Sequence, residues 1–117
     1  MGANDPRSST RDELLPGTLY MLILRTLDRS GEMHGYEIAE SIEQLSRDVL
    51  SIEEGSLYPA LQRMLIKGWV TAKWGATAEN RRARYYKLTA AGRKQLEAEI
   101  SGFERVIAAV TRVIKTA

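Results

Sequence analysis

Basic residues are concentrated between Gly55 and Leu88, where they could bind a polyanion. These 34 residues hold seven Lys or Arg and a single acidic residue, Glu79, which gives a local charge of +6. The segment before them sums to −6 and the segment after them to +2, so the total of +2 hides a strong segregation. Cationic side chains that neutralise phosphates release counterions, which drives much of the affinity for nucleic acid. The charge pattern therefore favours nucleic acid as the partner.

A helix within residues 53–67 is the first element that must position these charges. Its apolar residues repeat with helical spacing, so the other side chains turn away from the core. The core-facing residues are Leu57, Leu61, Met64 and Leu65. Pro59 has no N–H, so it is expected in or near the first turn, or else at a kink.

The outward face of this helix carries side chains that could read DNA. Gln and Arg make bidentate contacts to adenine and guanine edges, and Ser and Tyr hydroxyls suit phosphates. The candidate DNA-binding residues of this helix are Ser56, Tyr58, Pro59, Gln62 and Arg63. An ordinary solvated helix face explains the same residues equally well, and the basic segment downstream tips the balance toward DNA.

Two short runs with alternating apolar residues follow this helix and predict a β-hairpin. The residues that share one face are Val70, Ala72 and Trp74 in the first strand and Tyr86 and Leu88 in the second. The nine residues between Trp74 and Arg84 are expected to form the loop. The candidate phosphate contacts are Arg81, Arg82 and Arg84. A loop that only improves solubility would normally interleave acids, so a helix followed by a cationic hairpin indicates a winged-helix DNA-binding protein.

The tryptophans and the single histidine have structural explanations as well as functional ones. Trp69 and Trp74 could stack on single-stranded bases, but packing beside the short strand is expected for both. Tyr86 is expected to be buried. His34 stands at the start of a predicted helix, where His34 and Tyr36 are placed to contact the DNA backbone. Tyr36 therefore joins the candidate DNA-binding residues.

No enzyme constellation is visible in the chain. There is no nucleophile–base pair in a suitable context, no Gly-rich phosphate loop after a strand and no metal motif. With no cysteine and one histidine, disulfides and a usual zinc site are excluded. We therefore predict no catalytic residue, no metal and no cofactor. The longest apolar run, Leu19 to Leu24, is far too short to span a bilayer, and no signal peptide is visible, so no membrane partner and a cytoplasmic location are expected.

At 117 residues the chain fits one small domain plus an appendage. Residues 1–11 are small, polar and aperiodic, which predicts a flexible tail. Residues 12–92 are expected to form the DNA-binding domain, with its first two helices at about 18–29 and about 36–46. The inward-facing residues predicted for the second helix are Ile38, Ile42 and Leu45.

Residues 93–117 predict a C-terminal dimerisation helix. Its apolar residues step by 4, 3, 4, 3 and 4 in a heptad register, at Leu96, Ile100, Phe103, Ile107, Val110 and Ile114. Burying six such side chains is worth on the order of 9–18 kcal/mol gross, at about 1.5–3 kcal/mol each. The small domain before the helix has little room for this whole face. A second copy of the helix is the economical partner, so we predict a homodimer.

Several blocks of the sequence, taken in order, resemble the PadR family of bacterial transcriptional regulators. The blocks are Leu15-Pro16-Gly17-Thr18-Leu19, His34-Gly35-Tyr36-Glu37-Ile38, Gly55-Ser56-Leu57-Tyr58-Pro59-Ala60-Leu61-Gln62-Arg63, Gly68-Trp69-Val70 and Arg84-Tyr85-Tyr86-Lys87-Leu88-Thr89-Ala90-Ala91-Gly92. The resemblance implies a winged helix-turn-helix domain with a C-terminal dimerisation helix. It also implies binding to a palindromic operator, usually to repress transcription, with release by a small molecule in some members. At matching positions it places Ser56, Tyr58 and Pro59 at the DNA, flanked by Tyr36, Arg81 and Arg82.

The C-terminal part of the chain resembles the shorter family branch, because it is a single helix of about 25 residues. Some drug-binding relatives place a tryptophan between subunits in that helix. The C-terminal helix of this chain has no tryptophan, and Phe103 is the available aromatic wall for a small-molecule effector. The predicted fold is mainly α with a small β-hairpin (α+β). The predicted function is a homodimeric, sequence-specific DNA-binding transcriptional regulator, most simply a repressor. The alternatives are a winged-helix protein-interaction module and a ligand sensor with a small molecule in the dimer cleft.

Overall fold

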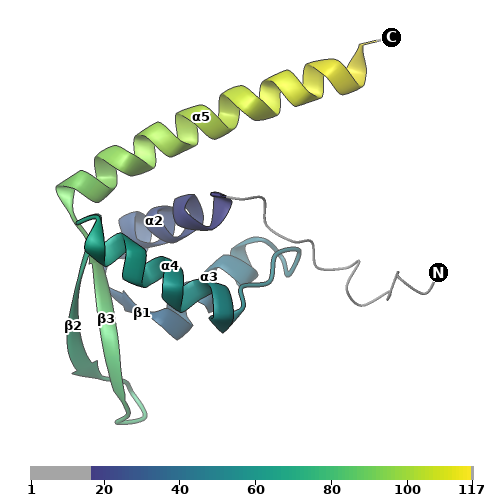
Figure 1. Ribbon diagram of the computed structural model, residues 1–117. Coiled ribbons are helices and arrows are strands. Elements are labelled where there is room, and N and C mark those ends of the chain that lie inside the picture. Colours follow the sequence, from purple (N-terminus) through teal and green to yellow (C-terminus); the bar gives the residue numbers. More distant parts are fainter. Residues whose placement is uncertain (1–16, 117) are drawn as a thin grey trace.

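The computed structural model describes residues 17–116, which form four helices and a small antiparallel sheet at one edge of the molecule (Figure 1). The elements are α2 (Thr18–Ser30), β1 (Met33–His34), α3 (Gly35–Leu45), α4 (Glu54–Ile66), β2 (Val70–Ala76), β3 (Arg82–Leu88) and α5 (Ala90–Lys115). The predicted α+β fold class is confirmed. The helices α2, α3 and α4 begin and end within one residue of the predicted positions, whereas α5 begins three residues before the predicted start at residue 93. The tail predicted at residues 1–11 lies outside the described residues.

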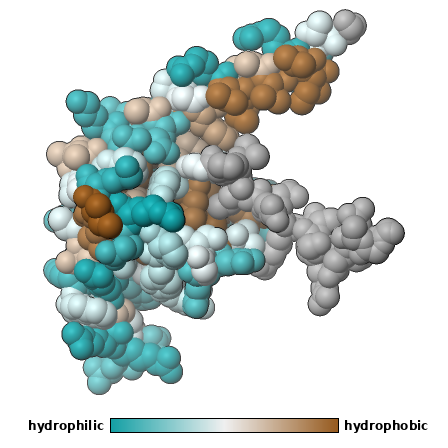
Figure 2. All heavy atoms as spheres, in the orientation of Figure 1, coloured by the Kyte–Doolittle hydropathy of each residue, from teal (hydrophilic) through white to brown (hydrophobic). Residues whose placement is uncertain are grey.

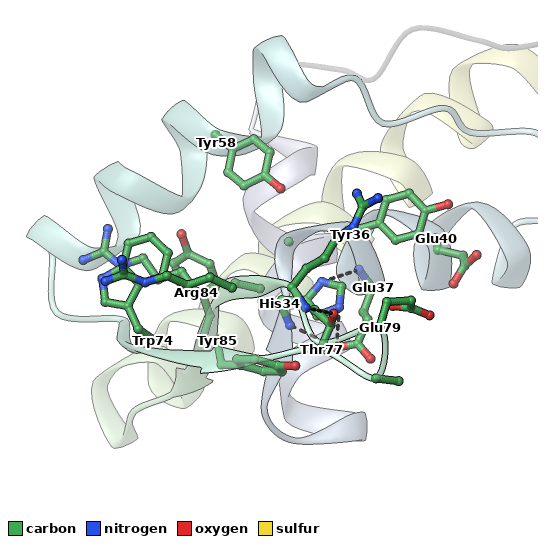
Figure 3. Close-up of a pocket in the computed structure, with 16 residues that line it drawn as sticks. His34, Tyr36, Glu37, Glu40, Tyr58, Trp74, Thr77, Glu79, Arg84 and Tyr85 are labelled. Carbon is green, nitrogen blue, oxygen red and sulfur yellow. Dashed lines mark hydrogen bonds and ion pairs between the residues drawn. The ribbon is translucent and has the colours of Figure 1, made fainter.

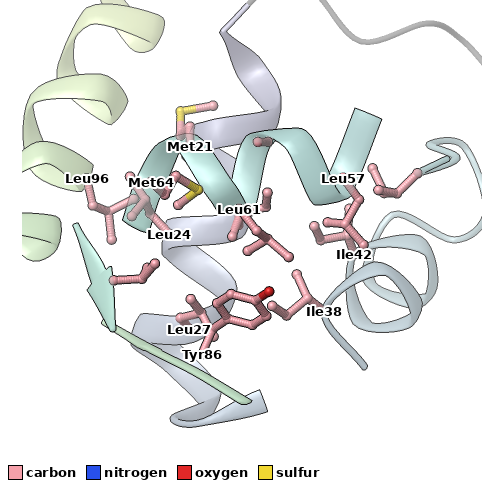
Figure 4. Close-up of a cluster of buried hydrophobic side chains, with 14 residues drawn as sticks. Met21, Leu24, Leu27, Ile38, Ile42, Leu57, Leu61, Met64, Tyr86 and Leu96 are labelled. Carbon is pink, nitrogen blue, oxygen red and sulfur yellow. The ribbon is translucent and has the colours of Figure 1, made fainter. Parts of the chain in front are cut away.

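The core lies where α2, α3 and α4 meet one face of the sheet (Figure 4). Ile23, Leu24 and Leu27 of α2 are almost completely buried, and so are Leu57 and Leu61 of α4. Because α2 also contacts α5, it is packed on two sides. These contacts hold α4 against the domain by one face and leave its opposite face in solvent.

In α3 the predicted inward face is right for Ile38 and Ile42, which are 0% and 4% exposed, and wrong for Leu45, which is 61% exposed. Leu45 is the last residue of the helix. The chain then turns away through Arg47 and Asp48, both with positive φ angles of 55° and 63°. The last turn of α3 therefore has no neighbouring element to cover Leu45.

The sheet differs from the predicted hairpin in two ways. A third strand, β1, pairs with β3 through Met33 and His34, which gives the order β1-β3-β2. The hairpin itself is also longer than predicted, because β2 continues to Ala76 and β3 begins at Arg82. The loop is therefore only residues 77–81, closed by hydrogen bonds between Thr77 and Arg81. Arg82 and Arg84 lie on a strand, where the register fixes the direction of their side chains.

The long helix α5 starts at a close contact with the domain. The hydroxyl of Thr89 accepts the N–H of Gly92 at 2.9 Å and donates to the carbonyl of Gly68 at 2.6 Å. Gly92 lies against the backbone carbonyl of Trp69, where any side chain would collide. The Arg93 guanidinium then forms an ion pair with Asp28 of α2 at 3.0 Å. These contacts fix the direction in which α5 leaves the domain.

The whole of α5 is about 39 Å long, for 26 residues at 1.5 Å per residue, and its C-terminal part extends away from the domain (Figure 1). Leu96 is only 3% exposed and belongs to the core of its own protomer, so it is not part of the exposed seam that the heptad pattern predicts. Beyond Gly102 every described residue of α5 is exposed. Its apolar surface is plain in Figure 2, and includes Phe103, Val106, Ile107, Val110, Val113 and Ile114. No helix in residues 17–116 is both long enough and apolar enough to cross a bilayer.

Candidate nucleic-acid interface

The outward face of α4 carries all five side chains predicted to contact DNA. Ser56, Tyr58, Pro59, Gln62 and Arg63 are all exposed, whereas the four residues opposite them are buried or half-buried. Helical spacing places Pro59 and Gln62 at the centre of this face, Tyr58 on the side toward α3, and Ser56 and Arg63 on the side toward α2. We call this surface the α4 face. Sequence reasoning missed one member, Ile66, which is 76% exposed and follows Gln62 by four residues on the same line.

Pro59 lies deeper in α4 than the first turn. The helix begins at Glu54, so Pro59 is its sixth residue, and α4 runs through it without interruption. A proline at this position cannot donate the usual hydrogen bond to the carbonyl four residues earlier, which is that of Gly55. The Gly55 carbonyl, at the N-terminal end of the α4 face, therefore receives no hydrogen bond from position 59.

On one side of the α4 face lies a groove of about 900 Å³, between the start of α3 and the hairpin (Figure 3). Tyr58 points into it from α4, while Tyr36 and Glu40 line it from α3, and Trp74 and Arg84 from the hairpin. All three predicted wing arginines line the same groove. The structure thus brings together five of the nine predicted DNA-binding residues around one groove: Tyr36, Tyr58, Arg81, Arg82 and Arg84.

The other four predicted residues do not line this groove. Ser56, Pro59 and Arg63 instead border a smaller hollow between α4 and the start of α2. Arg63 donates a hydrogen bond to the hydroxyl of Tyr20 at 3.2 Å, which holds its guanidinium toward α2. Gln62 lies between the two hollows, at the crest of the α4 face.

His34 has a structural role at the start of α3. Its Nδ1 accepts the N–H of Glu37 at 3.4 Å, and the Glu37 carboxylate accepts the N–H of His34 at 3.1 Å. This reciprocal pair is a capping box, which satisfies two backbone donors at the helix start. The His34 ring also stacks on Tyr36 and meets the edge of Tyr85. The Nδ1 atom of His34 is therefore engaged in capping α3. Tyr36, the other residue that the sequence predicts to contact the DNA backbone, is 65% exposed.

Tyr58 lies directly against the backbone of α3. A Cβ atom built on Gly35 would come within 2.7 Å of the Tyr58 hydroxyl, so only glycine leaves room for the ring in this position. Partial burial raises the pKa of Tyr58 above its ordinary value, and the nearby carboxylate of Glu54 raises it further. The phenol is therefore a neutral hydrogen-bond donor, with its hydroxyl at the edge of the groove (Figure 3).

The hairpin has one cationic face. Arg82 lies over the Trp74 ring with its guanidinium carbon 4.4 Å from the ring centroid, and Arg84 lies 5.9 Å from the same centroid. Among residues 17–116, no carboxylate forms an ion pair with Arg81, Arg82 or Arg84. Lys73, by contrast, pairs with Glu32 at 3.5 Å. Three guanidinium groups without a carboxylate partner thus remain close to the α4 face.

The tryptophan predictions divide in the same region. Trp69 is half-buried and meets Tyr20 edge to face, as expected for a packing residue. Trp74 is 57% exposed, so the expectation that it packs is wrong. Tyr86 is 5% exposed, which confirms its predicted burial. Desolvation raises the pKa of Tyr86, partly offset by the guanidinium of Arg84, which lowers it.

No metal chemistry is indicated in the described part of the chain. Within residues 17–116, no three His, Cys, Asp or Glu side chains come together in a way that could hold a metal ion. What the arrangement offers is hydrogen-bond donors and positive charge on two neighbouring convex elements beside a groove. Such a surface can bind a polyanion and contact its edges.

Comparisons with known proteins agree with this arrangement. Residues 23–98 match the family described as the transcriptional regulator PadR-like family. A transcriptional regulator from Clostridium thermocellum is 26% identical, with a TM-score of 0.77 over 85% of this chain and 95% of that one. A PadR-like transcriptional regulator from Bacillus cereus is 25% identical, with a TM-score of 0.74 over 91% and 100%.

A third similar structure contains DNA. Bacillus subtilis PadR in complex with operator DNA is 25% identical, with a TM-score of 0.62 over 71% of this chain and 47% of that one. The family match covers well over half of the chain and includes four of the five sequence blocks that carry the resemblance. The resemblance inferred from those blocks is confirmed: the chain belongs to the PadR-like family of transcriptional regulators.

Proposed function

We propose that this regulator is a homodimeric repressor that binds a palindromic operator in double-stranded DNA. The observation that carries the proposal is the exposed trio Arg81, Arg82 and Arg84, which lacks carboxylate partners among residues 17–116 and lies beside the α4 face. Exposed cations that neutralise phosphates give strong, salt-dependent binding. The operator complex of Bacillus subtilis PadR supports the same use of this fold.

In this proposal α4 enters the major groove and the hairpin acts as a wing. Gln62, at the crest of the α4 face, is the residue best placed for bidentate contact with adenine. The hydroxyls of Ser56, Tyr58 and Tyr36 suit phosphate oxygens on either side of it. The wing arginines then lie along the neighbouring backbone, and Arg63 contacts the DNA from the side of α2.

The proposed dimer forms through α5. Six large apolar side chains between Phe103 and Ile114 are 37% to 78% exposed in the single protomer. An exposed apolar patch of this kind is typical of a surface that binds another protein. The same face carries the heptad spacing of a helix that pairs with another helix. A second copy of α5 would bury that face. The seam between the two helices then runs from Ile100 to Ile114, because Leu96 is already buried in its own protomer.

Dimer symmetry determines the form of the operator. Two α4 helices related by a twofold axis contact two half-sites about one helical turn, roughly 34–36 Å, apart on the same side of the duplex. A protein seated on such a site excludes polymerase from an overlapping promoter, so repression is the simplest outcome. In this proposal residues 12–92 bind DNA, residues 93–117 form the dimer, and the protein acts in the cytoplasm.

Fluorescence anisotropy tests the proposal directly. Labelled duplexes from the region upstream of the protein's own coding sequence are titrated at two salt concentrations, with random DNA as competitor. We expect tight, competitor-resistant binding with a steep salt slope, and weaker binding by R81Q/R82Q. The matched control R105Q/R112Q removes two exposed arginines from α5 and is expected to bind normally. No binding at low salt would overturn the DNA proposal and favour a protein-interaction module.

A cleft supports a second candidate function, that of a small-molecule sensor. It measures about 400 Å³ and lies between the start of α2 and α5. Met21, Phe103 and Val106 make part of it apolar, and Glu99 and Arg105 supply opposite charges. A planar ligand bound there would alter the angle between α5 and the domain. Calorimetric titration with a panel of planar aromatic compounds tests this, and F103A is expected to abolish any binding found.

A further inference from the structure

We propose that Trp74 is a positioning residue, which holds Arg82 and Arg84 as one preorganised cationic pair for DNA and acts through them and not by contacting DNA itself. This inference rests on the DNA-binding function proposed above and concerns how the wing achieves it. It assigns a purpose to the most exposed tryptophan of the chain, whose side chain the core does not use.

The strand register places the three side chains on one face of the hairpin. Trp74 on β2 is directly opposite Arg84 on β3, and Ala76 is directly opposite Arg82. Residues paired across strands share a face, and so do residues two apart on one strand. Arg82 and Arg84 therefore flank the ring, one diagonally and one directly across. Alanine at position 76 leaves the space through which Arg82 can reach the ring.

The distances fit cation–π contact. The guanidinium carbon of Arg82 is 4.4 Å from the ring centroid and that of Arg84 is 5.9 Å from it. Attraction between a cation and an aromatic face acts within about 6 Å of the centroid. Because Arg82 covers one face of the ring, that face is not available to stack on a base.

The opposite face of the hairpin is occupied by contacts within the protein. Tyr85 donates a hydrogen bond to the carbonyl of Ala76 at 3.1 Å, and its ring lies 3.0 Å from where a side chain on Gly75 would begin. Lys73 on that face is paired with Glu32. One face of the hairpin is thus held by contacts within the protein, while Arg82 and Arg84 lie on the other face without a carboxylate partner among residues 17–116.

Preorganisation is the physical reason for the arrangement. An arginine held in one conformation before binding loses less side-chain entropy when it reaches a phosphate. A carboxylate would also hold the arginines, but it would cancel the charge that the DNA needs. An aromatic ring holds them and leaves their charge intact.

A double-mutant cycle on the full-length protein tests the inference. Anisotropy with the operator duplex is measured for the wild type, W74A, R82A/R84A and W74A/R82A/R84A. We expect W74A alone to weaken binding about 5- to 10-fold, because two arginines lose their support. In the background without these arginines, removal of Trp74 is expected to cost less than about twofold. W74F keeps an aromatic ring and is expected to recover most of the affinity.

A structural readout in the free protein completes the test. In the wild type the Trp74 ring current is expected to shift the Arg82 side-chain protons upfield, and W74A removes that shift without changing the circular dichroism spectrum. K73A, on the other face of β2, is the matched control and should leave both the shift and operator affinity unchanged. Equal losses from W74A in both backgrounds would show that Trp74 contacts DNA directly, and no loss in either would show that it is idle; both overturn the inference. Failure of the wild type to bind any duplex would instead overturn the proposed function.

Discussion

The Tyr58 ring of α4 lies on the backbone of Gly35, the first residue of α3, so closely that a Cβ at position 35 would be 2.7 Å from the tyrosine hydroxyl. This contact joins the start of one helix to the proposed DNA-contacting face of the next. It sets where the Tyr58 hydroxyl stands relative to the groove. Glycine is therefore needed at position 35 to leave room for the Tyr58 side chain, and not because the backbone turns there.

Gly35→Ala is expected to affect DNA binding more than stability. The exposed Tyr58 ring can swing outward to make room, and alanine improves helix propensity by up to about 1 kcal/mol, so the free energy of unfolding should change little. In the proposed complex the displaced hydroxyl would lose its phosphate contact, which should weaken operator binding roughly tenfold. Urea unfolding and anisotropy measure the two effects. In a Tyr58→Ala background the same substitution should cost no further affinity; an undiminished loss there would place its effect elsewhere.

Gln62→Ala is expected to change sequence preference. The side chain is at the crest of the α4 face, so it should contact a base edge, and losing a bidentate contact costs about 1–3 kcal/mol at one position. The measurement is binding to a set of operator duplexes with every base substituted in turn. The variant should tolerate changes at one base pair in each half-site. Equal losses on operator and random DNA would assign Gln62 to the backbone instead.

Arg82→Ala is expected to weaken binding to every duplex alike. Its charge has no carboxylate partner among residues 17–116, so it is available to a phosphate. Each phosphate contact contributes about 0.9 to the slope of log affinity against log salt, so the slope should become shallower by roughly one unit. Lys73→Ala removes a charge that is already paired with Glu32 and should leave the slope as it is. An unchanged slope in the Arg82 variant would remove that residue from the phosphate contacts.

The helices were predictable from sequence because their faces repeat with a period set by the backbone. Ile38, Leu57 and Leu61 are buried where that period places them. The same rule failed for Leu45, because burial also requires a neighbouring element, and the chain turns away at Arg47. Periodicity predicts the direction in which a side chain points, but it does not predict whether another element lies there to bury it.

The same limit explains the errors in the wing and in α5. Alternation correctly puts Trp74 on the same face of β2 as Val70. The strand has extended past the edge of the core by the time it reaches Trp74, so the ring is exposed. The heptad includes Leu96, yet the first turns of α5 still lie on α2, and Leu96 is buried there. The two-residue strand β1 has no periodicity to detect, since it exists only through pairing with β3. The candidate DNA-binding residues were recognisable from type and charge, but their division between two hollows depends on how α3 and the hairpin flank α4.

Stability is expected to fall in alkaline solution through Tyr86. Its pKa is raised above the ordinary value of 10.0, chiefly by desolvation. Below pH 10 both the folded and the unfolded chain hold the phenolic proton, so the group has no effect. Above it, the unfolded chain releases the proton while the folded chain retains it, and the free energy of unfolding decreases as pH rises. Urea melts between pH 8 and about 11 should show a smaller decrease for Tyr86→Phe; parallel curves for the two proteins would exclude Tyr86 as the cause.

The last prediction concerns the dimer. Ile107 lies in the middle of the exposed apolar face of α5 and is 40% exposed in the protomer, so Ile107→Glu adds a charge to the seam without disturbing the domain core. A buried, unpaired carboxylate is costly, so the variant should sediment as a folded monomer at concentrations where the wild type is a dimer. Ser101→Glu, on the opposite side of the same helix, is the control and should remain dimeric. Because two half-sites are contacted together only by a dimer, the monomer should also bind a full operator no better than a single half-site. A monomeric wild type in sedimentation equilibrium, or an Ile107→Glu variant that stays dimeric, would show that α5 does not form the interface.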